Sequence, residues 1–250
     1  MRMVGENGFG KGMSRLEGAS VVVIGGSSGI GLASAEAAHA AGASVTIVGR
    51  SQEKLERARM TIGGETSTFS LDVTDRAAVE ALFSRIERMD HLLVSAAETN
   101  SIHIKEDEFE DVRPTVDIRL WGGLYAAKYA ARRMDGGSVT FMSGTSAWRP
   151  YTGSSAVAAS GGAIEALGRA LALELAPIRV NTICAGIVDT PLLEGYYGKQ
   201  RKEILRDLVS HLPVGRIGTP EDIADGVIFL MGNGFITGTV LHIDGGKLLV

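Results

Sequence analysis

The feature that most constrains this chain is a glycine-rich turn between a short apolar run and an alanine-rich segment. The run at 21–24 is followed by Gly25, and Gly29 and Gly31 complete the pattern G-x-x-x-G-x-G. The first glycine permits a tight turn, the second lets backbone approach a pyrophosphate, and the third lets a helix pack closely on the strand. The turn therefore predicts a strand, a phosphate-binding loop and a helix whose free N–H groups favour an anion.

The residues inside the turn extend this phosphate site. Ser27 and Ser28 supply hydroxyl donors, and Ile30 begins the expected helix. A glycine-rich turn that binds nothing is the alternative, but the strand before it and the helix after it favour a nucleotide. The residues expected to bind phosphate are Gly25, Ser27, Ser28, Gly29, Ile30 and Gly31.

Short β-branched runs alternate with longer helical segments along the chain. The runs are apolar nearly throughout, which is typical of strands buried on both faces of a parallel sheet. Strands are expected at 21–24, 44–48, 67–71, 91–96, 138–143, 179–184 and 240–243. Helices are expected at 30–41, 52–60, 75–88, 112–134, 157–175 and 220–231. The alternation predicts an α/β fold, a single doubly wound Rossmann domain with a parallel sheet of about seven strands flanked by helices.

Composition narrows the class of protein. Hydrophobic residues make up 45% of the chain and the net charge is −4, with no Lys/Arg cluster that indicates nucleic-acid binding. The single cysteine, Cys184, excludes an intrachain disulfide and a Cys/His metal set, and it fits a reducing cytoplasm. We therefore expect a cytoplasmic protein with no metal and no nucleic-acid partner.

The N-terminal residues 1–12 are Gly-rich and lack the apolar segment of a signal peptide. We expect them to form a disordered extension of one domain that covers 13–250. No apolar stretch approaches the length expected of a membrane span, so no membrane contact is expected.

The end of the second expected strand bears on which dinucleotide binds. Arg50 follows it, about 20 residues after the glycines, where an NAD-binding chain carries an acid for the ribose 2′-hydroxyl. A guanidinium suits the 2′-phosphate of NADP, so NADP(H) is expected, with NAD(H) or a merely solvated arginine as alternatives. Asp72, after the third expected strand, is placed either to accept a hydrogen bond from adenine or to cap a helix.

Ordered matches from about Leu16 to the C-terminus resemble the short-chain dehydrogenase/reductase family. They are GGSSGIG at 25–31, LDVT at 71–74, RVNTICAG at 179–186 (with Ala185 in place of a proline), VDTP at 188–191, and the segments 213–224 and 238–246. The resemblance implies a Rossmann fold and a nicotinamide cofactor. It further implies cofactor contacts from Asp72, Val73, Ala96, Ala97, Val188 and Thr190.

The family's catalytic residues, an Asn, a Ser, a Tyr and a Lys, are all replaced. In the family a Lys⁺ brings the tyrosine, which titrates near ~10, into the range of acid–base catalysis. Counting from the flanking matches puts Arg119 at the Asn position, Gly144 at Ser, Val157 at Tyr and Gly161 at Lys. Glu98 also replaces a family glycine, which puts an ionisable group near the nicotinamide end of the cofactor.

Four polar residues are candidates for a replacement chemistry. Arg119 and Glu98 are expected to face one cleft and to pair, and Tyr151 lies in the loop before Val157. Ser143 adjoins the lost serine, but on a strand its side chain should point to the opposite face. Ordinary surface or structural polarity is the alternative for each, so the catalytic residue stays unassigned among them.

Three functions fit these observations. The first is an oxidoreductase that transfers hydride between NADP(H) and an unknown carbonyl or alcohol substrate by a non-standard site. The second is a catalytically inactive NADP(H)-binding regulatory or partner protein, and the third is a non-redox lyase or isomerase on the same scaffold.

The resemblance also implies a homo-oligomer, a tetramer before a dimer, that pairs through the two long helices. The small residues expected on the pairing faces are Gly122, Gly123, Ala126, Ala127, Ala130, Gly161, Gly162, Ala166 and Ala170.

Overall fold

The computed structural model describes residues 16–98, 103–193 and 201–250, so the extension expected over 1–12 lies outside the described residues. One seven-stranded sheet runs in the order β3-β2-β1-β4-β5-β6-β7. Every neighbouring pair is parallel. The strand order reverses between β1 and β4, as in a doubly wound sheet. The predicted Rossmann architecture is confirmed.

The strands fall close to the predicted runs. They are β1 (Ser20–Ile24), β2 (Ser44–Gly49), β3 (Ser67–Ser70), β4 (His91–Val94), β5 (Ser138–Gly144), β6 (Arg179–Ala185) and β7 (Val240–Ile243). The central strands β1 and β4 are buried over almost their whole length, which explains their continuous apolar character.

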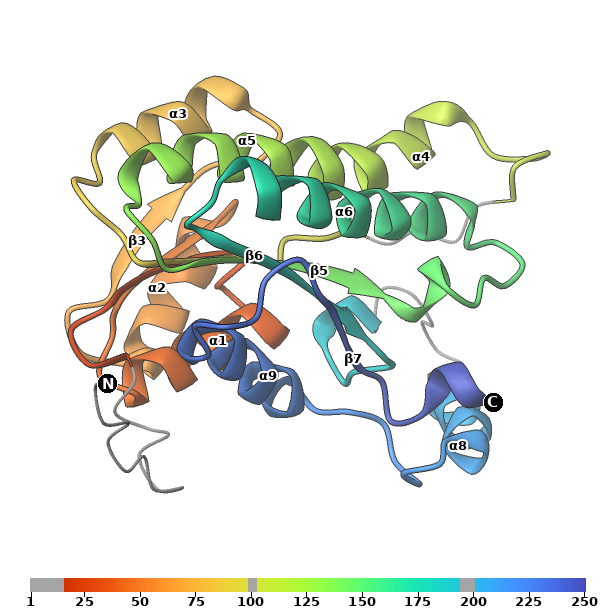
Figure 1. Ribbon diagram of the computed structural model, residues 1–250. Coiled ribbons are helices and arrows are strands. Elements are labelled where there is room, and N and C mark those ends of the chain that lie inside the picture. Colours follow the sequence, from red (N-terminus) through yellow and green to blue (C-terminus); the bar gives the residue numbers. More distant parts are fainter. Residues whose placement is uncertain (1–15, 99–102, 194–200) are drawn as a thin grey trace, which may run out of the picture.

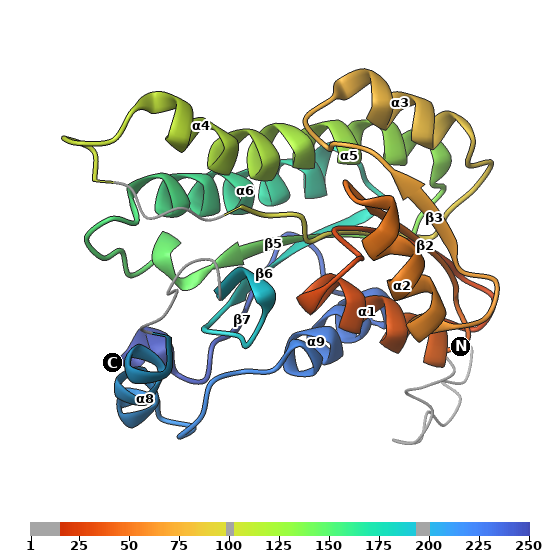
Figure 2. The same cartoon turned by 180° about the vertical axis from the view of Figure 1, so that it is seen from behind.

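Helices cover both faces of the sheet (Figures 1 and 2). One face carries α1 (Gly29–Ala40), α2 (Gln52–Ile62) and α9 (Pro220–Gly232). The other carries α3 (Arg76–Ser84), α4 (Phe109–Val116), α5 (Gly122–Ala130) and α6 (Ser155–Glu174). A further helix that the sequence analysis did not predict, α8 (Arg201–His211), lies near the C-terminus.

The helix expected over 112–134 is not continuous. A π-helical turn, Asp117–Trp121, separates α4 from α5, and a 3₁₀ turn, Ala131–Arg133, follows α5. Pro114 lies inside α4, where it has no N–H to donate to the preceding turn. π-turns inside helices are rare and occur frequently at functional sites.

The small residues expected to meet a second copy on α5 are instead buried within this chain. They are Gly122, Gly123, Ala126, Ala127 and Ala130. A Cβ on Gly123 would lie 2.9 Å from Cδ1 of Ile164, so the glycine lets α5 approach α6 of the same chain. The prediction that this α5 face pairs with another protomer is wrong. On α6, Ala166 and Ala170 do face solvent.

The apolar character of α6 also corrects an expectation. By length and composition alone this helix could cross a membrane, with a mean hydropathy of 1.3 over its most apolar window. However, 44% of that window is buried inside the protein. Ile164 and Leu171 belong to the core between α6 and the sheet, so α6 has the composition of a core helix.

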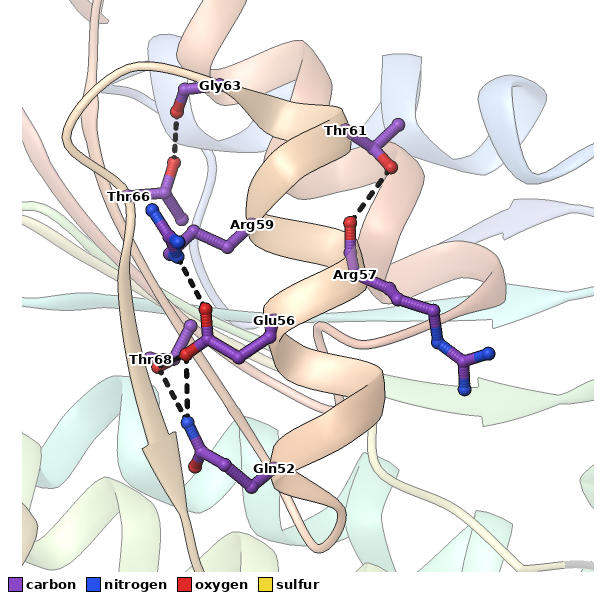
Figure 3. Close-up of polar contacts among 8 residues, drawn as sticks. All are labelled: Gln52, Glu56, Arg57, Arg59, Thr61, Gly63, Thr66 and Thr68. Carbon is purple, nitrogen blue, oxygen red and sulfur yellow. Dashed lines mark hydrogen bonds and ion pairs between the residues drawn. The ribbon is translucent and has the colours of Figure 1, made fainter.

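Polar contacts attach α2 to the edge strand β3 (Figure 3). The Glu56 carboxylate accepts hydrogen bonds from Arg59 Nε at 2.7 Å, Gln52 Nε2 at 2.9 Å and Thr68 Oγ1 at 3.2 Å. The Arg59 hydrogen bond above all holds the pKa of Glu56 below its usual range. This network joins α2 to β3 through Thr68.

His91 begins β4 at the end of the sheet opposite to the glycine-rich turn. The residue is 7% exposed, and its Nδ1 lies 2.9 Å from Oγ of Ser138. Burial, with repulsion from Arg179, lowers the pKa of His91 to about 4.

This shift predicts a pH dependence of stability. Above the unfolded pKa of about 6.5 the ring is neutral in both states, and stability is unaffected. As the pH falls from about 6.5 to 4 only the unfolded chain takes up the proton, so the free energy of unfolding should fall by about 3 kcal/mol. Urea denaturation of the wild type and of His91→Gln across this range measures the effect. The variant should lose that part of the pH dependence, and an unchanged dependence would contradict the assignment.

Candidate active site

A cavity of about 470 Å³ lies at the carboxyl ends of the strands, where the order of the sheet reverses. Ligands of doubly wound sheets bind at this point. All the residues predicted to bind the cofactor line this cleft except Val188, which lines the cavity next to it. The lining residues among them are Gly25, Ser27, Ser28, Gly29, Ile30, Gly31, Arg50, Asp72, Val73, Ala96, Ala97 and Thr190.

The glycines of the turn are required by close packing. A Cβ on Gly25 would lie 2.6 Å from the backbone nitrogen of Ala96, and one on Gly31 would lie 2.1 Å from the carbonyl oxygen of Gly25. Backbone rather than side chain therefore forms this wall of the cleft. The Ser28 side chain makes no capping hydrogen bond, so no side chain there satisfies the first N–H groups of α1. Such a helix start fits a phosphate group.

Arg50 and Glu98 form an ion pair beside the cleft. Arg50 Nη1 lies 3.6 Å from Oε2 of Glu98, and the two side chains are 66% and 34% exposed. The prediction that Glu98 pairs with Arg119 is wrong, because the Glu98 carboxylate turns toward the end of β2 whereas the Arg119 guanidinium is buried against α6. The acidic group therefore lies beside the residue predicted to bind a 2′-phosphate.

The structure also decides between two positions for a helix cap. Asp75 caps α3, because its Oδ1 accepts hydrogen bonds from the backbone nitrogens of Ala77 and Ala78. Asp72 is not the cap. Its Oδ1 accepts from the backbone nitrogen of Thr74 at 2.9 Å and from the Thr74 hydroxyl at 2.8 Å, and the residue lines the cleft. Contact with adenine stays a prediction for Asp72.

A second cavity of about 440 Å³ adjoins the first. The residues that line both are Ile30, Ser95, Ala97, Thr190 and Leu192. Its wall is largely apolar, and α8 contributes Ile204 and Leu208 to it. Sequence reasoning missed this helix, although the spacing of four residues between these two apolar side chains is the signal that marks its buried face. Among the described residues no group of His, Cys, Asp and Glu has the arrangement of a metal site.

The four positions predicted to correspond to the family's catalytic residues lie together at this second cavity. Arg119, Gly144 and Val157 line it. Gly161 lies just behind, where a Cβ would be 3.1 Å from Cβ of Ala147 and 3.9 Å from Nη1 of Arg119. The structure therefore brings these four predicted positions together in space, and none of them carries a hydroxyl or an ammonium group.

Arg119 is buried in the wall of this cavity. Its side chain comes from the π-turn, and the residue is 8% exposed. Nη1 donates to the carbonyl oxygen of Val157 at 3.2 Å and to Oγ of Ser160 at 3.0 Å, while Nε has no hydrogen-bond partner among the described residues. Burial lowers the pKa of Arg119 to about 10, so the guanidinium is still charged at neutral pH.

The other two candidates differ in what they contact. The Ser143 hydroxyl donates to the Glu165 carboxylate, which also accepts the indole N–H of Trp148 at 3.0 Å and is 4% exposed. The Ser143 hydroxyl is therefore already hydrogen-bonded to a residue of α6. Tyr151 is 51% exposed and lines the cavity, where a substrate would have access to it.

The switch-point cleft, the glycine turn and the adjoining cavity together define a dinucleotide-binding α/β protein. A family model described as enoyl-(acyl carrier protein) reductase matches residues 24–247. Short-chain dehydrogenase/reductase ATR9 of Stachybotrys chlorohalonatus is 30% identical over 253 residues, which cover 95% of this chain and all of that protein. The chain thus belongs to the short-chain dehydrogenase/reductase family of oxidoreductases.

Solved structures agree with this assignment. The MalC reductase/Diels-Alderase from Malbranchea aurantiaca superposes with a TM-score of 0.89 at 29% identity, over 96% of this chain and all of that one. A small-chain dehydrogenase in complex with NADPH superposes with a TM-score of 0.79 at 32% identity, over 94% of this chain and all of that one.

The closed space at Gly161 predicts different outcomes for two neighbouring substitutions in α6. Gly162→Ala meets no atom within 4 Å and should raise the free energy of unfolding by about 0.5–1 kcal/mol, through helix propensity. Gly161→Ala gains the same propensity but brings a methyl group 3.1 Å from Cβ of Ala147, so its gain should be smaller or reversed. Urea denaturation compares the two, and equal gains would show that the site is open.

Proposed function

We propose that the protein is an NADP(H)-dependent oxidoreductase that transfers hydride between the cofactor and a carbonyl or alcohol substrate at a site without the family's tyrosine. The observation that carries this proposal is the continuity of the two cavities: five residues line both the cofactor cleft and the apolar cavity. Family membership supports the reaction class, and the NADPH-bound relative supports the cofactor.

Different residues of this chain would bind different parts of the cofactor. The backbone of the glycine turn would bind the pyrophosphate, Arg50 the 2′-phosphate, and Asp72 with Val73 the adenine. Ala96, Ala97, Val188 and Thr190 would hold the nicotinamide half at the boundary between the cavities. When bound, the reduced cofactor supplies the hydride.

In the family a tyrosine supplies the proton for the substrate oxygen, and here another group would have to supply it. Val157 has no ionisable group, and loss of a positioned acid reduces the rate by about 10²–10⁴-fold. Tyr151 lines this cavity and is about half-exposed, and water that reaches its hydroxyl would deliver the proton. The same loss favours a second function, an NADP(H)-binding regulatory or partner protein without turnover.

Two measurements on the purified protein test the proposal. Fluorescence titration with NADPH measures binding, and absorbance follows NADPH consumption with a panel of aldehydes, ketones and quinones. Consumption supports the oxidoreductase. Tight binding without consumption on any substrate favours the regulatory protein, whereas a cofactor-independent conversion favours a lyase or isomerase. Failure to bind NADPH or NADH overturns the cofactor assignment.

Arg50 and Glu98 provide a matched pair of variants for the choice of cofactor. Arg50→Gln removes charge-assisted hydrogen bonds to a 2′-phosphate and should weaken NADPH binding by about 10-fold or more, with NADH binding unchanged. Glu98→Gln frees the guanidinium and removes a negative charge beside the phosphate, so it should strengthen NADPH binding alone. Titrations with both cofactors measure this. Equal effects on NADPH and NADH would show that Arg50 does not select the phosphate.

We also propose a cytoplasmic homo-oligomer, a tetramer before a dimer, with no nucleic-acid or membrane partner. The support is an exposed strip on α6 that includes Ala166, Ala170 and Leu173, the last of which is 84% exposed. Sedimentation equilibrium measures the assembly.

A further inference from the structure

Among the described residues that line the apolar cavity, the charged ones are all cations. Arg119, Arg149 and Lys247 line it, and the described lining residues include no Asp or Glu. No ion pair joins any of these three cations to a carboxylate within the described ranges. A cavity of this kind is complementary to an apolar ligand that bears a negative charge.

Arg119 is a buried cation whose hydrogen bonds are incomplete among the described residues. A buried cation is strongly unfavourable unless it is paired and fully hydrogen-bonded. The hydrogen bonds that Arg119 makes go to two neutral acceptors, a carbonyl and a hydroxyl, and its Nε has none. Arg179 shows the contrast, because its guanidinium donates to three backbone carbonyls and ties β6 to the end of α9 and the loop after it.

Two features of the backbone lie next to the Arg119 side chain. Arg119 belongs to the π-turn, and its guanidinium lies beside Gly161. A side chain at 161 would begin 3.9 Å from Nη1 of Arg119. An irregular helix turn and a missing side chain thus combine to hold one cation at the cavity wall.

We propose that the substrate is an apolar carbonyl compound that carries a carboxylate, and that Arg119 binds this carboxylate. The proposal rests on the proposed function and names its substrate class. In the reductive direction the hydride adds to the carbonyl carbon, the carbonyl oxygen takes one proton from water, and NADPH is oxidised to NADP⁺. The product is the hydroxy acid. Arg149 and Lys247 add to the positive potential that attracts the anion.

The test separates binding from turnover by using the oxidised cofactor, which cannot reduce a ketone. Phenylpyruvate and benzyl methyl ketone share an aromatic ring and a carbonyl group, but only the first carries a carboxylate. Isothermal titration calorimetry of the protein saturated with NADP⁺ should show at least tenfold tighter binding of phenylpyruvate. Lack of this preference, or of phenylpyruvate binding, overturns the proposal.

Variants assign the preference to one side chain. Arg119→Met should abolish it and leave cofactor binding unchanged, Arg119→Lys should retain part of it, and Arg149→Gln should change it only slightly. The Val157 carbonyl keeps its hydrogen bond from the Ser160 hydroxyl at 3.1 Å, so the methionine variant leaves that acceptor satisfied. A preference that survives Arg119→Met, or that disappears in Arg149→Gln instead, overturns the assignment.

The two proposals fail differently. Arg119-dependent binding of phenylpyruvate without NADPH consumption would refute hydride transfer but support the carboxylate site. Equal reduction of both ketones, unaffected by Arg119→Met, would support the oxidoreductase and refute the carboxylate site.

Discussion

The packing of α1 on β1 is the constraint on which the rest of the structure depends. With no atom beyond Cα at Gly31, the helix can start against the carbonyl of Gly25, at the carboxyl end of β1. Ser95, just beyond β4, donates its hydroxyl to the Ile24 carbonyl at 3.1 Å. This hydrogen bond links the ends of β1 and β4, where the strand order of the sheet reverses. Because Ser95 and Ile30 line both cavities, this close backbone contact bears on the position of the cofactor cleft and of the adjoining apolar cavity.

The two arginines of the site illustrate opposite electrostatic regimes. Arg50 is exposed and pairs with Glu98 in solvent, where an ion pair is worth about 0–1 kcal/mol, so an incoming phosphate can readily replace the carboxylate. Arg119 is buried, where a missing partner destabilises the protein far more. The surrounding fold has to offset that penalty, which sets Arg119 apart from the exposed charges of the surface.

Local backbone requirements made much of the fold predictable. The glycine turn and the buried strands follow from steric limits and from apolar runs that a sequence displays directly. Side-chain directions do not: Glu98 pairs with Arg50 rather than Arg119 because the path of the chain after β4 decides which cation it reaches. Small residues on α5 indicated a close approach, but not that the partner is α6 of the same chain. Pro114 was visible in the sequence, whereas the π-turn that follows it depends on packing.

The four positions predicted to correspond to the family's catalytic residues differ in the space around them. Gly144 leaves open space, since a Cβ there would meet only the Ala185 carbonyl at 3.7 Å, and a serine side chain would fit. Gly161 does not, because Ala147 and the guanidinium of Arg119 already occupy its surroundings. A side chain at 161 would begin 3.9 Å from Nη1 of Arg119, and like-charge repulsion would disfavour a second cation near that guanidinium. The surroundings of Gly161 therefore disfavour a lysine while Arg119 is present.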